Sequence, residues 1–421
     1  MNNLDSLTEE IVERANLISF HTPSHAGKLS DELLLCDVTE LFYTDNLLSP
    51  EGAIEELEKN IASAYGAEAC FISTQGATHN IFQAVFACLN EGAFLVIGKA
   101  HASVYNALRI LGAKAYHADS FDGAIPKCVK TVIFTSPDYF GNTVNLRALC
   151  KTAKEKGLAT IVDASHGSHF AFGDNLPDSA TLYADLVIHS LHKTLPVITG
   201  GSVLLCKNDY VKRAKAARKF LHTTSPNYMV LCSIERAIKD FSENGRKYYR
   251  DIENEVKKAR RILKPPFYAE ENDDFSRFVI TSPFEGKSLY NKLVGCGFCA
   301  EMAYNNKVVF IVNPFNYTHI VSVAEAVNEA KNLPLYEKTD FPSKAHPKPT
   351  LIEFGNDFEE IPFSEAEGRI VYNEIGFYPP GVPFIYSGDV IKREHIEWIK
   401  TYFGKAEFFG SDGKTVFVLK K

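Results

Sequence analysis

Long apolar runs and clusters of like charge are both absent from this sequence, and each absence excludes a class of function. No stretch approaches the roughly 20 uninterrupted apolar residues of a membrane-spanning helix, so we expect a soluble protein with no membrane partner. The first 16 residues are polar and acidic, unlike a signal peptide, and predict that the protein is not secreted. The net charge of -7 is spread over interspersed charges of both signs, which predicts no nucleic-acid partner.

Paired cysteines of the kind that staple a small secreted domain are also lacking. Nine cysteines, an odd number, are scattered through 421 residues, and this favours reduced thiols in the cytoplasm. Cys296 and Cys299 have the spacing of a redox pair or half a zinc site. No second pair at zinc-like spacing follows, so buried structural thiols are the favoured interpretation.

What the sequence does contain is a regular alternation of short apolar runs and helical patterns. The alternation predicts an α/β fold whose mostly parallel sheet is covered on both faces. The predicted strands lie at 70–73, 94–97, 132–134, 159–162, 186–188 and 202–205. The predicted helices lie at 54–65, 81–89, 104–111 and 146–156, the first with Ser49-Pro50 as its N-cap and first-turn proline.

The length predicts one large and one smaller domain. A helical pattern from 228 to 263, broken near Asn244-Gly245, closes at Pro265-Pro266, where we place the boundary. Two strand-like runs and further helices beyond it predict a smaller α+β domain. The predicted segments are an N-terminal arm at 1–19 with a short helix, a major domain at 20–265, and a small domain at 266–421 that ends in a separate segment at 338–421.

A lysine and an aspartate each follow a predicted strand directly. Lys193 lies in Ser190-Leu-His-Lys193-Thr, and Asp163 ends the strand before it. Ligands of α/β sheets bind at the carboxyl ends of strands, so both side chains are placed at that edge. Pyridoxal phosphate needs a lysine for its aldehyde and a carboxylate for its pyridine nitrogen. A surface lysine and a helix-capping aspartate are the alternative interpretations.

A glycine-containing turn between a predicted strand and a predicted helix supplies donors for a phosphate. Gly76 lets the backbone approach, and the amides of Ala77 and Thr78 and the Thr78 hydroxyl can donate. The motif is weak by itself, and an ordinary strand-to-helix turn is the alternative.

Several histidines also follow predicted strands. His101 is a candidate to stack on a cofactor ring, with an ordinary hydrogen-bonded histidine as the alternative. Four others, His166, His169, His189 and His192, raise the possibility of a metal cluster. No cysteine or carboxylate completes a recognised ligand spacing, so we predict no metal.

These pieces belong to a longer series of motifs. In chain order the series is Phe20-His-Thr-Pro-Ser-His25, Asp37-Val-Thr-Glu40, Asp45-Asn-Leu47, Pro50-Glu-Gly52, Gly76-Ala-Thr78, His101 with Ser103-Val-Tyr105, Asp163 with His166-Gly167, Ser190-Leu-His-Lys193-Thr-Leu-Pro196, Thr224-Ser-Pro-Asn-Tyr228 and Tyr378-Pro-Pro-Gly-Val-Pro383. Over nearly the whole chain it resembles the short bacterial form of the Orn/Lys/Arg decarboxylase family, pyridoxal-phosphate enzymes with the aspartate aminotransferase fold (fold type I).

The resemblance implies a role for each candidate residue. Lys193 would carry the cofactor, Asp163 would hold its pyridine nitrogen, and His101 would stack on its ring. Lys193, His101 and His192 would take part in catalysis. The remaining contacts to the cofactor would come from Gly76, Ala77, Thr78, His166, Ser190 and His192, together with Thr224 or Ser225 reaching the cofactor of a neighbouring subunit at a dimer interface.

The chain also departs from the family pattern around the expected substrate. Members usually have glycine at Ser24, lysine near Ala26 and at Ala102, glutamate and alanine at Ala164-Ser165, and threonine at Asp138. These departures put the substrate and the reaction in more doubt than the cofactor.

The resemblance implies decarboxylation of arginine, lysine or ornithine to a polyamine-type amine, in a homo-oligomer of at least two subunits. Recognition of the distal amine needs an acidic group, for which Asp45, Glu51, Asp138 and Glu374 are equal candidates. The alternatives are another pyridoxal-phosphate reaction on the same scaffold, such as transamination or β-elimination, and a non-catalytic regulatory relative.

Overall fold

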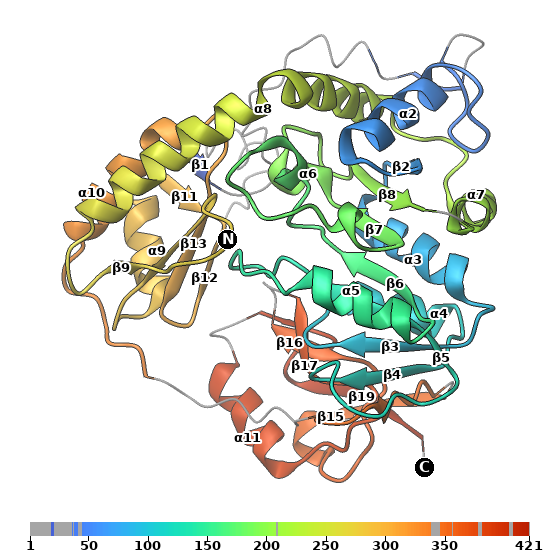
Figure 1. Ribbon diagram of the computed structural model, residues 1–421. Coiled ribbons are helices and arrows are strands. Elements are labelled where there is room, and N and C mark those ends of the chain that lie inside the picture. The colour runs from blue at the N-terminus through green and yellow to red at the C-terminus, as the bar shows by residue number, and fades with distance from the viewer. Residues whose placement is uncertain are drawn as a thin grey trace.

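An eight-stranded sheet lies at the centre of the largest part of the protein in the computed structural model (Figure 1). The structure describes residues 18–20, 36, 38–40, 44–207, 209–337, 346–355, 357–377, 381–403 and 407–420. The strands, in spatial order, are β14 (Thr350–Leu351), β4 (Ala115–Ala118), β3 (Ala93–Ile97), β5 (Val129–Thr135), β6 (Ala159–Asp163), β7 (Leu186–His189), β8 (Ser202–Cys206) and β2 (Ala69–Ser73). From β4 to β7 they are parallel.

Both faces of this sheet are buried because successive strand residues join different cores. Phe71 and Leu204 belong to one apolar cluster, and their chain neighbours Ile72 and Leu205 belong to the other. Such strands read as continuous apolar runs, which is why the sequence pattern identified them. The helices of this part are α2 (Ala53–Tyr65), α3 (Gly76–Cys88), α4 (Ala102–Ile110), α5 (Leu146–Glu155), α6 (Leu191–Thr194) and α7 (Tyr210–Leu221). The predicted α/β fold with a mostly parallel sheet is confirmed.

The start of α2 differs from the prediction. Its N-cap is Gly52, and the carboxylate of Asp45 accepts hydrogen bonds from the backbone N–H groups of Gly52 and Ile54 at 2.8 and 3.0 Å. Ser49 and Pro50 precede the helix and do not cap it. The Asp45 side chain, seven residues before Gly52, therefore accepts the backbone hydrogen bonds that the side chain of a local N-cap residue would otherwise accept.

The long helix α8 (Tyr228–Ile262) is continuous through Asn244 and Gly245, where the sequence predicted a break. Gly245 is buried, and a Cβ atom there would lie 2.8 Å from the backbone oxygen of Phe172. The glycine thus permits close packing of α8 on the chain at Phe172 and does not end the helix. The helix spans two parts of the molecule, because it packs on both α2 and α10 (Ile320–Asn328) (Figure 1).

A second, smaller layer follows α8. It contains the sheet β12-β13-β10-β9 and the parallel pair β1-β11; α9 packs against the strands, and α10 packs on α9 and α8. The bounds are β1 (Ile18–Phe20), β9 (Tyr268–Ala269), β10 (Arg277–Thr281), β11 (Phe298–Ala300), β12 (Met302–Tyr304), β13 (Lys307–Ile311), α9 (Gly286–Val294) and α10 (Ile320–Asn328). The short helix predicted in the N-terminal arm lies outside the described residues.

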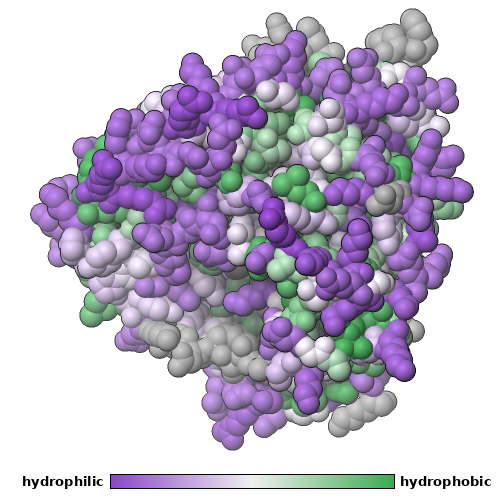
Figure 2. All heavy atoms as spheres, viewed as in Figure 1, coloured by the Kyte–Doolittle hydropathy of each residue, from purple (hydrophilic) through white to green (hydrophobic). Residues whose placement is uncertain are grey.

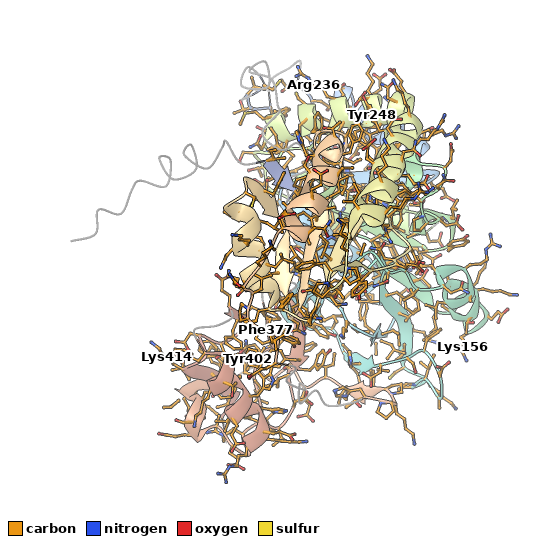
Figure 3. The ribbon with its side chains drawn as sticks, turned by 90° about the vertical axis from the view of Figure 1, so that its left-hand side faces the viewer. Lys156, Arg236, Tyr248, Phe377, Tyr402 and Lys414 are labelled. Atoms are coloured by element: carbon orange, nitrogen blue, oxygen red, sulfur yellow. The ribbon has the colours of Figure 1, made fainter. Side chains whose placement is uncertain are left out.

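The C-terminal part is built of short strands and one helix around a separate apolar cluster. Its elements are β15 (Phe358–Pro362), β16 (Ile375–Phe377), β17 (Val382–Ile385), α11 (Arg393–Tyr402), β18 (Phe408–Phe409) and β19 (Thr415–Leu419). Phe377 on β16 packs against Tyr402, with ring centroids 5.7 Å apart (Figure 3). Buried Glu374 and Arg109 of α4 approach to 3.4 Å, which ties this part to the large sheet.

The face seen in Figure 2 is mostly hydrophilic, with hydrophobic residues in small separate patches. Among the described residues, no helix combines the length and the apolar character needed to cross a membrane.

Candidate active site

A cavity of about 740 Å³ lies where six strands of the large sheet end. Its lining includes a residue at or just after the end of each of β2 to β7, in chain order Gly76, His101, Asp119, Thr135, Asp163 and Ser190. The C-terminal part adds Phe377, Val382, Pro383, Phe384 and Tyr386. This is the edge at which α/β sheets bind ligands, and the site therefore draws on segments far apart in the sequence.

Lys193 lines this cavity from the short helix α6. Its Nζ lies 3.0 Å from Nε2 of His166. Burial lowers the pKa of the lysine amine, although the nearby Asp163 carboxylate opposes this effect. The pKa of His166 is held well below its usual value by burial and by the adjacent Lys193 and Arg277. The site thus disfavours positive charge on both groups.

Asp163 ends β6 and is 4% exposed, at the wall of the cavity. Its Oδ1 accepts hydrogen bonds from the backbone N–H of Ser165 at 3.1 Å and from the Ser165 hydroxyl at 2.5 Å. Ser165, one of the departures from the family pattern, therefore orients the carboxylate.

The predicted phosphate turn forms the start of α3. Gly76 has φ +81°, and its N–H donates to the carbonyl of Gly200 at 2.7 Å. Gly200 has φ +100°, and a Cβ atom there would lie 2.8 Å from the carbonyl oxygen of Thr74. Two glycines thus hold the turn so that Ala77 and Thr78, in the first turn of the helix, line the cavity. First-turn N–H groups have no partner within the helix and suit an anion.

His101 and His192 both line the cavity. His101 is the N-cap of α4, and its Nδ1 accepts a hydrogen bond from the backbone N–H of Ser103 at 3.2 Å. Burial and the nearby Lys193 lower its pKa. Nδ1 of His192 lies 3.2 Å from the carbonyl oxygen of Gly201, which orients the ring by hydrogen bonding to the backbone.

Thr224 and Ser225 are not part of the cavity. Both are exposed in the connection between α7 and α8. The connection lies beside the phosphate turn, because the N–H of Asn227 donates to the Thr74 hydroxyl at 3.4 Å. Their predicted contact with a neighbouring subunit stays a prediction.

The other histidines have separate structural partners. His169 lies 3.2 Å from the Asp274 carboxylate, and Nδ1 of His189 lies 2.9 Å from the carbonyl oxygen of Ala164. Among the described residues, no group of three or more histidine, cysteine, aspartate or glutamate side chains is arranged to hold a metal ion. Cys296 is exposed and Cys299 is half-buried, with its Sγ 3.3 Å from the Tyr290 hydroxyl, so the expectation that both thiols are buried is wrong.

Three residues near Lys193 had no signal in the sequence patterns. Arg277, at the start of β10, reaches Nδ1 of His166 at 3.2 Å and is 1% exposed. Tyr139 packs on the His166 ring with centroids 4.5 Å apart, and its hydroxyl donates to Glu301 at 2.5 Å. Each contact joins residues more than 25 positions apart in the sequence. The periodicity of strands and helices predicts only local structure and therefore not these contacts.

The structure distinguishes among the acidic residues that the sequence offered as equal candidates for binding the distal amine of the substrate. Asp45 caps α2, and Glu374 pairs with Arg109. Asp138 lines the cavity, but its carboxylate already accepts from backbone N–H groups of its own turn. Asp119, which the sequence did not single out, also lines the cavity, and its side chain is 49% exposed.

Two family profiles match this chain. The profile of the Orn/Lys/Arg decarboxylase major domain matches residues 20–296, and that of the C-terminal domain matches residues 336–412. An uncharacterized Bacillus subtilis protein, YaaO, is 28% identical over 437 residues, covering 91% of each chain. An arginine decarboxylase of Halalkalibacterium halodurans is 24% identical, covering 91% of this chain and 90% of its own.

Two solved structures show the same fold at low identity. Lysine decarboxylase A from Pseudomonas aeruginosa matches with a TM-score of 0.74 and 16% identity, over 98% of this chain and 80% of that one. Serine palmitoyltransferase from Sphingomonas wittichii matches with a TM-score of 0.58 and 15% identity, over 74% and 86%. The family match spans well over half of the sequence, and the chain therefore belongs to the Orn/Lys/Arg decarboxylase family of pyridoxal-phosphate-dependent enzymes.

Proposed function

We propose that this chain holds pyridoxal phosphate on Lys193 and removes the α-carboxylate of a basic amino acid as carbon dioxide. The observation that carries the proposal is the convergence, in one cavity, of the Lys193 amine, the Asp163 carboxylate and the first turn of α3. These are the three kinds of group that the cofactor requires for its aldehyde, its ring nitrogen and its phosphate.

The residues present fit this cofactor in their chemistry. The lysine amine has a lowered pKa, so a larger fraction of it carries the free electron pair that attacks an aldehyde. The glycines at 76 and 200 keep side chains away from the phosphate turn. When bound, the cofactor withdraws electrons from the substrate α-carbon as the carboxylate leaves.

The chain's own residues bind and orient the reactants. Asp163, fixed by Ser165, would hold the ring nitrogen, and His101 would cover the ring from the N-terminus of α4. Lys193, whose Nζ lies 3.0 Å from Nε2 of His166, would return a proton to the α-carbon. Phe377, Phe384 and Tyr386 would help to exclude water from the opposite wall.

Arginine is the first substrate to test, because several relatives that align over about nine-tenths of this chain are named arginine decarboxylases. We infer that Asp119 binds the distal cation. Its Oδ2 accepts one backbone hydrogen bond, from His346 at 2.6 Å, and its Oδ1 lies 3.8 Å from His117. Burial lowers the pKa of His117 to about 4, so at neutral pH this ring is uncharged and forms no ion pair with Asp119.

Thr224 and Ser225 support a further part of the proposal, that the active form contains at least two copies. They carry a motif that resembles the family's site, yet they are exposed outside the cavity of their own chain. A second copy seated on this surface would bring them to its own cavity. The mass of the protein in solution, measured by light scattering, tests this: a monomer that is fully active contradicts it.

The decisive experiment incubates the purified protein and pyridoxal phosphate with arginine, lysine and ornithine separately and measures carbon dioxide and the amine product. Decarboxylation that is lost in Lys193→Ala supports the proposal. Borohydride treatment should leave a pyridoxyl group on Lys193, found by peptide mass analysis. A keto acid product would reassign the reaction to transamination, and no product from any common amino acid would favour a regulatory relative.

A further inference from the structure

Arg277 is not part of the cavity lining, but it contacts His166, which lines the cavity. It is 1% exposed and does not line the cavity, so in this structure it is not placed to touch a ligand. Its Nη2 lies 3.2 Å from Nδ1 of His166, while Nε2 of the same ring lies 3.0 Å from Nζ of Lys193. The three side chains thus form a line in which the imidazole separates the guanidinium from the lysine.

The hydrogen-bonding chemistry of these groups fixes where the protons are. A guanidinium can only donate, so Nδ1 of His166 must accept and carries no hydrogen. A neutral imidazole has one acceptor and one donor nitrogen, so Nε2 carries the hydrogen and donates. The group that receives this hydrogen bond is Nζ of Lys193, and an ammonium group has no acceptor. The lysine must therefore be a neutral amine.

The other protonation states do not satisfy both contacts. If Lys193 were an ammonium group donating to Nε2, both ring nitrogens would have to accept, and only an imidazolate anion can do so. A doubly protonated ring would direct an N–H at the guanidinium, which also presents N–H. Burial of His166 and its cationic neighbours lower its pKa, in agreement with a neutral ring.

We propose that Arg277 is a positioning residue that fixes His166 in the tautomer with hydrogen on Nε2 and thereby holds Lys193 as a neutral amine. The proposal rests on the proposed function, because a neutral amine is the form in which Lys193 reacts with the cofactor aldehyde. The other charged or titratable groups that face the pair are Asp163, Glu301, His101, His192 and Tyr139, whose ring packs on His166.

The surroundings of Arg277 keep it in this place. Its backbone N–H donates to the carbonyl of Asp274 at 3.0 Å, and its carbonyl accepts from the Asn272 side chain at 2.6 Å. Gly141 has φ +88°, and a Cβ atom there would lie 2.8 Å from Cβ of Arg277. The aliphatic part of the Arg277 side chain thus packs against the backbone at Gly141, and only glycine allows so close an approach.

The test reads the tautomer directly in full-length protein without cofactor. Nitrogen-15 NMR of labelled histidines separates the two neutral tautomers, and the signal of His166 is the one lost in His166→Gln. Wild-type protein should show hydrogen on Nε2 at neutral pH. Hydrogen on Nδ1, or a doubly protonated ring, would overturn the proposal without any variant of Arg277.

Variants then test the cause. Arg277→Met removes the donor and should admit the other tautomer, whereas Arg277→Lys keeps an obligate donor and should preserve Nε2–H. Carbon-13 methylation of the lysines gives a second readout, the proton affinity of Lys193. In Arg277→Met this affinity should rise about tenfold, as expected when the hydrogen bond that selects the tautomer of His166 is lost. An unchanged tautomer and proton affinity in this variant would refute the role of Arg277.

Arg218→Met is the matched control. Arg218 is an equally buried arginine that hydrogen-bonds the Leu47 carbonyl and Glu58 outside the cavity, so its loss disturbs packing without reaching His166. It should leave both readouts at wild-type values. Failure of decarboxylation with every amino acid would reject the proposed function, while the tautomer measurement would still decide the role of Arg277.

Discussion

The substitution Gly200→Ala tests the phosphate turn where it is most tightly packed. A side chain at φ +100° strains the backbone by about 1–3 kcal/mol. The new Cβ atom would also lie 2.8 Å from the Thr74 carbonyl oxygen, so that the carbonyl must move by roughly 0.6 Å to reach ordinary contact at 3.4 Å. Thr74 lies two residues before Gly76, and its displacement should misalign the amides of the first turn of α3.

The expected effect on cofactor affinity follows from the bonds that are lost. A hydrogen bond to a charged group contributes about 1.5–3 kcal/mol, so the loss of one between an amide and the phosphate weakens binding by roughly 10- to 150-fold. The assay titrates cofactor-free protein with pyridoxal phosphate and follows visible absorbance, with thermal melting recorded in parallel.

Gly112→Ala is the control that separates the effect of backbone strain from the effect of displacing the Thr74 carbonyl. Gly112 also has a positive φ, +67°, but a Cβ atom there meets nothing within 4 Å, and the residue does not line the cavity. This variant should lose stability by about 1–2 kcal/mol and bind the cofactor as the wild type does. Equal cofactor affinity in the two variants would refute the assignment of the turn at Gly76 as the phosphate site.

Three further predictions concern the cavity wall, stability and capping. Asp119→Asn should raise KM for arginine about tenfold or more, since the neutral amide loses a charged hydrogen bond, while Asp138→Asn changes it little; steady-state kinetics of both variants measures this. The neutral, buried His117 should make the protein less stable as the pH falls from 6.5 towards 4, because the unfolded chain takes up a proton first, by up to about 3 kcal/mol. Urea unfolding at several pH values should show a smaller loss in His117→Phe, and an identical loss would contradict this. Asp45→Ala should lower the free energy of unfolding by about 1–2 kcal/mol, whereas Ser49→Ala should be neutral, and the reverse order would show that Ser49 is the cap.

The large sheet could be predicted from sequence because its signals are local. Each strand that the sequence predicted contains a short run of mostly apolar residues, and Asp163 and Lys193 lie one and five residues after such runs. The fold therefore brings them to the same edge without any further information. Some elements lie where the patterns predict nothing. β4 has only four residues, and the buried residues of α7 are Ala214, Ala217 and Arg218, which form no apolar stripe.

The rest of the site could not be predicted because it depends on contacts between distant segments. Arg277 stands at the start of an apolar strand and reads as an ordinary flanking charge, yet it meets His166 from 111 positions away. Gly245 reads as a helix breaker until the packing of Phe172 is known. Likewise, the aromatic wall of Phe377, Phe384 and Tyr386 depends on how the C-terminal part docks, which periodicity does not encode.

Through the pairing of β14 with β4, the C-terminal part also covers one edge of the large sheet. Thr350 and Leu351 pair with His117 and Tyr116, at what would otherwise be the open border of the eight-stranded sheet. A protein cut after residue 337 would present unpaired amide and carbonyl groups of β4, which can recruit strands from other molecules. Shortened versions should therefore form aggregates, so that the last fifth of the chain keeps the border of the large sheet paired while it lines part of the cavity.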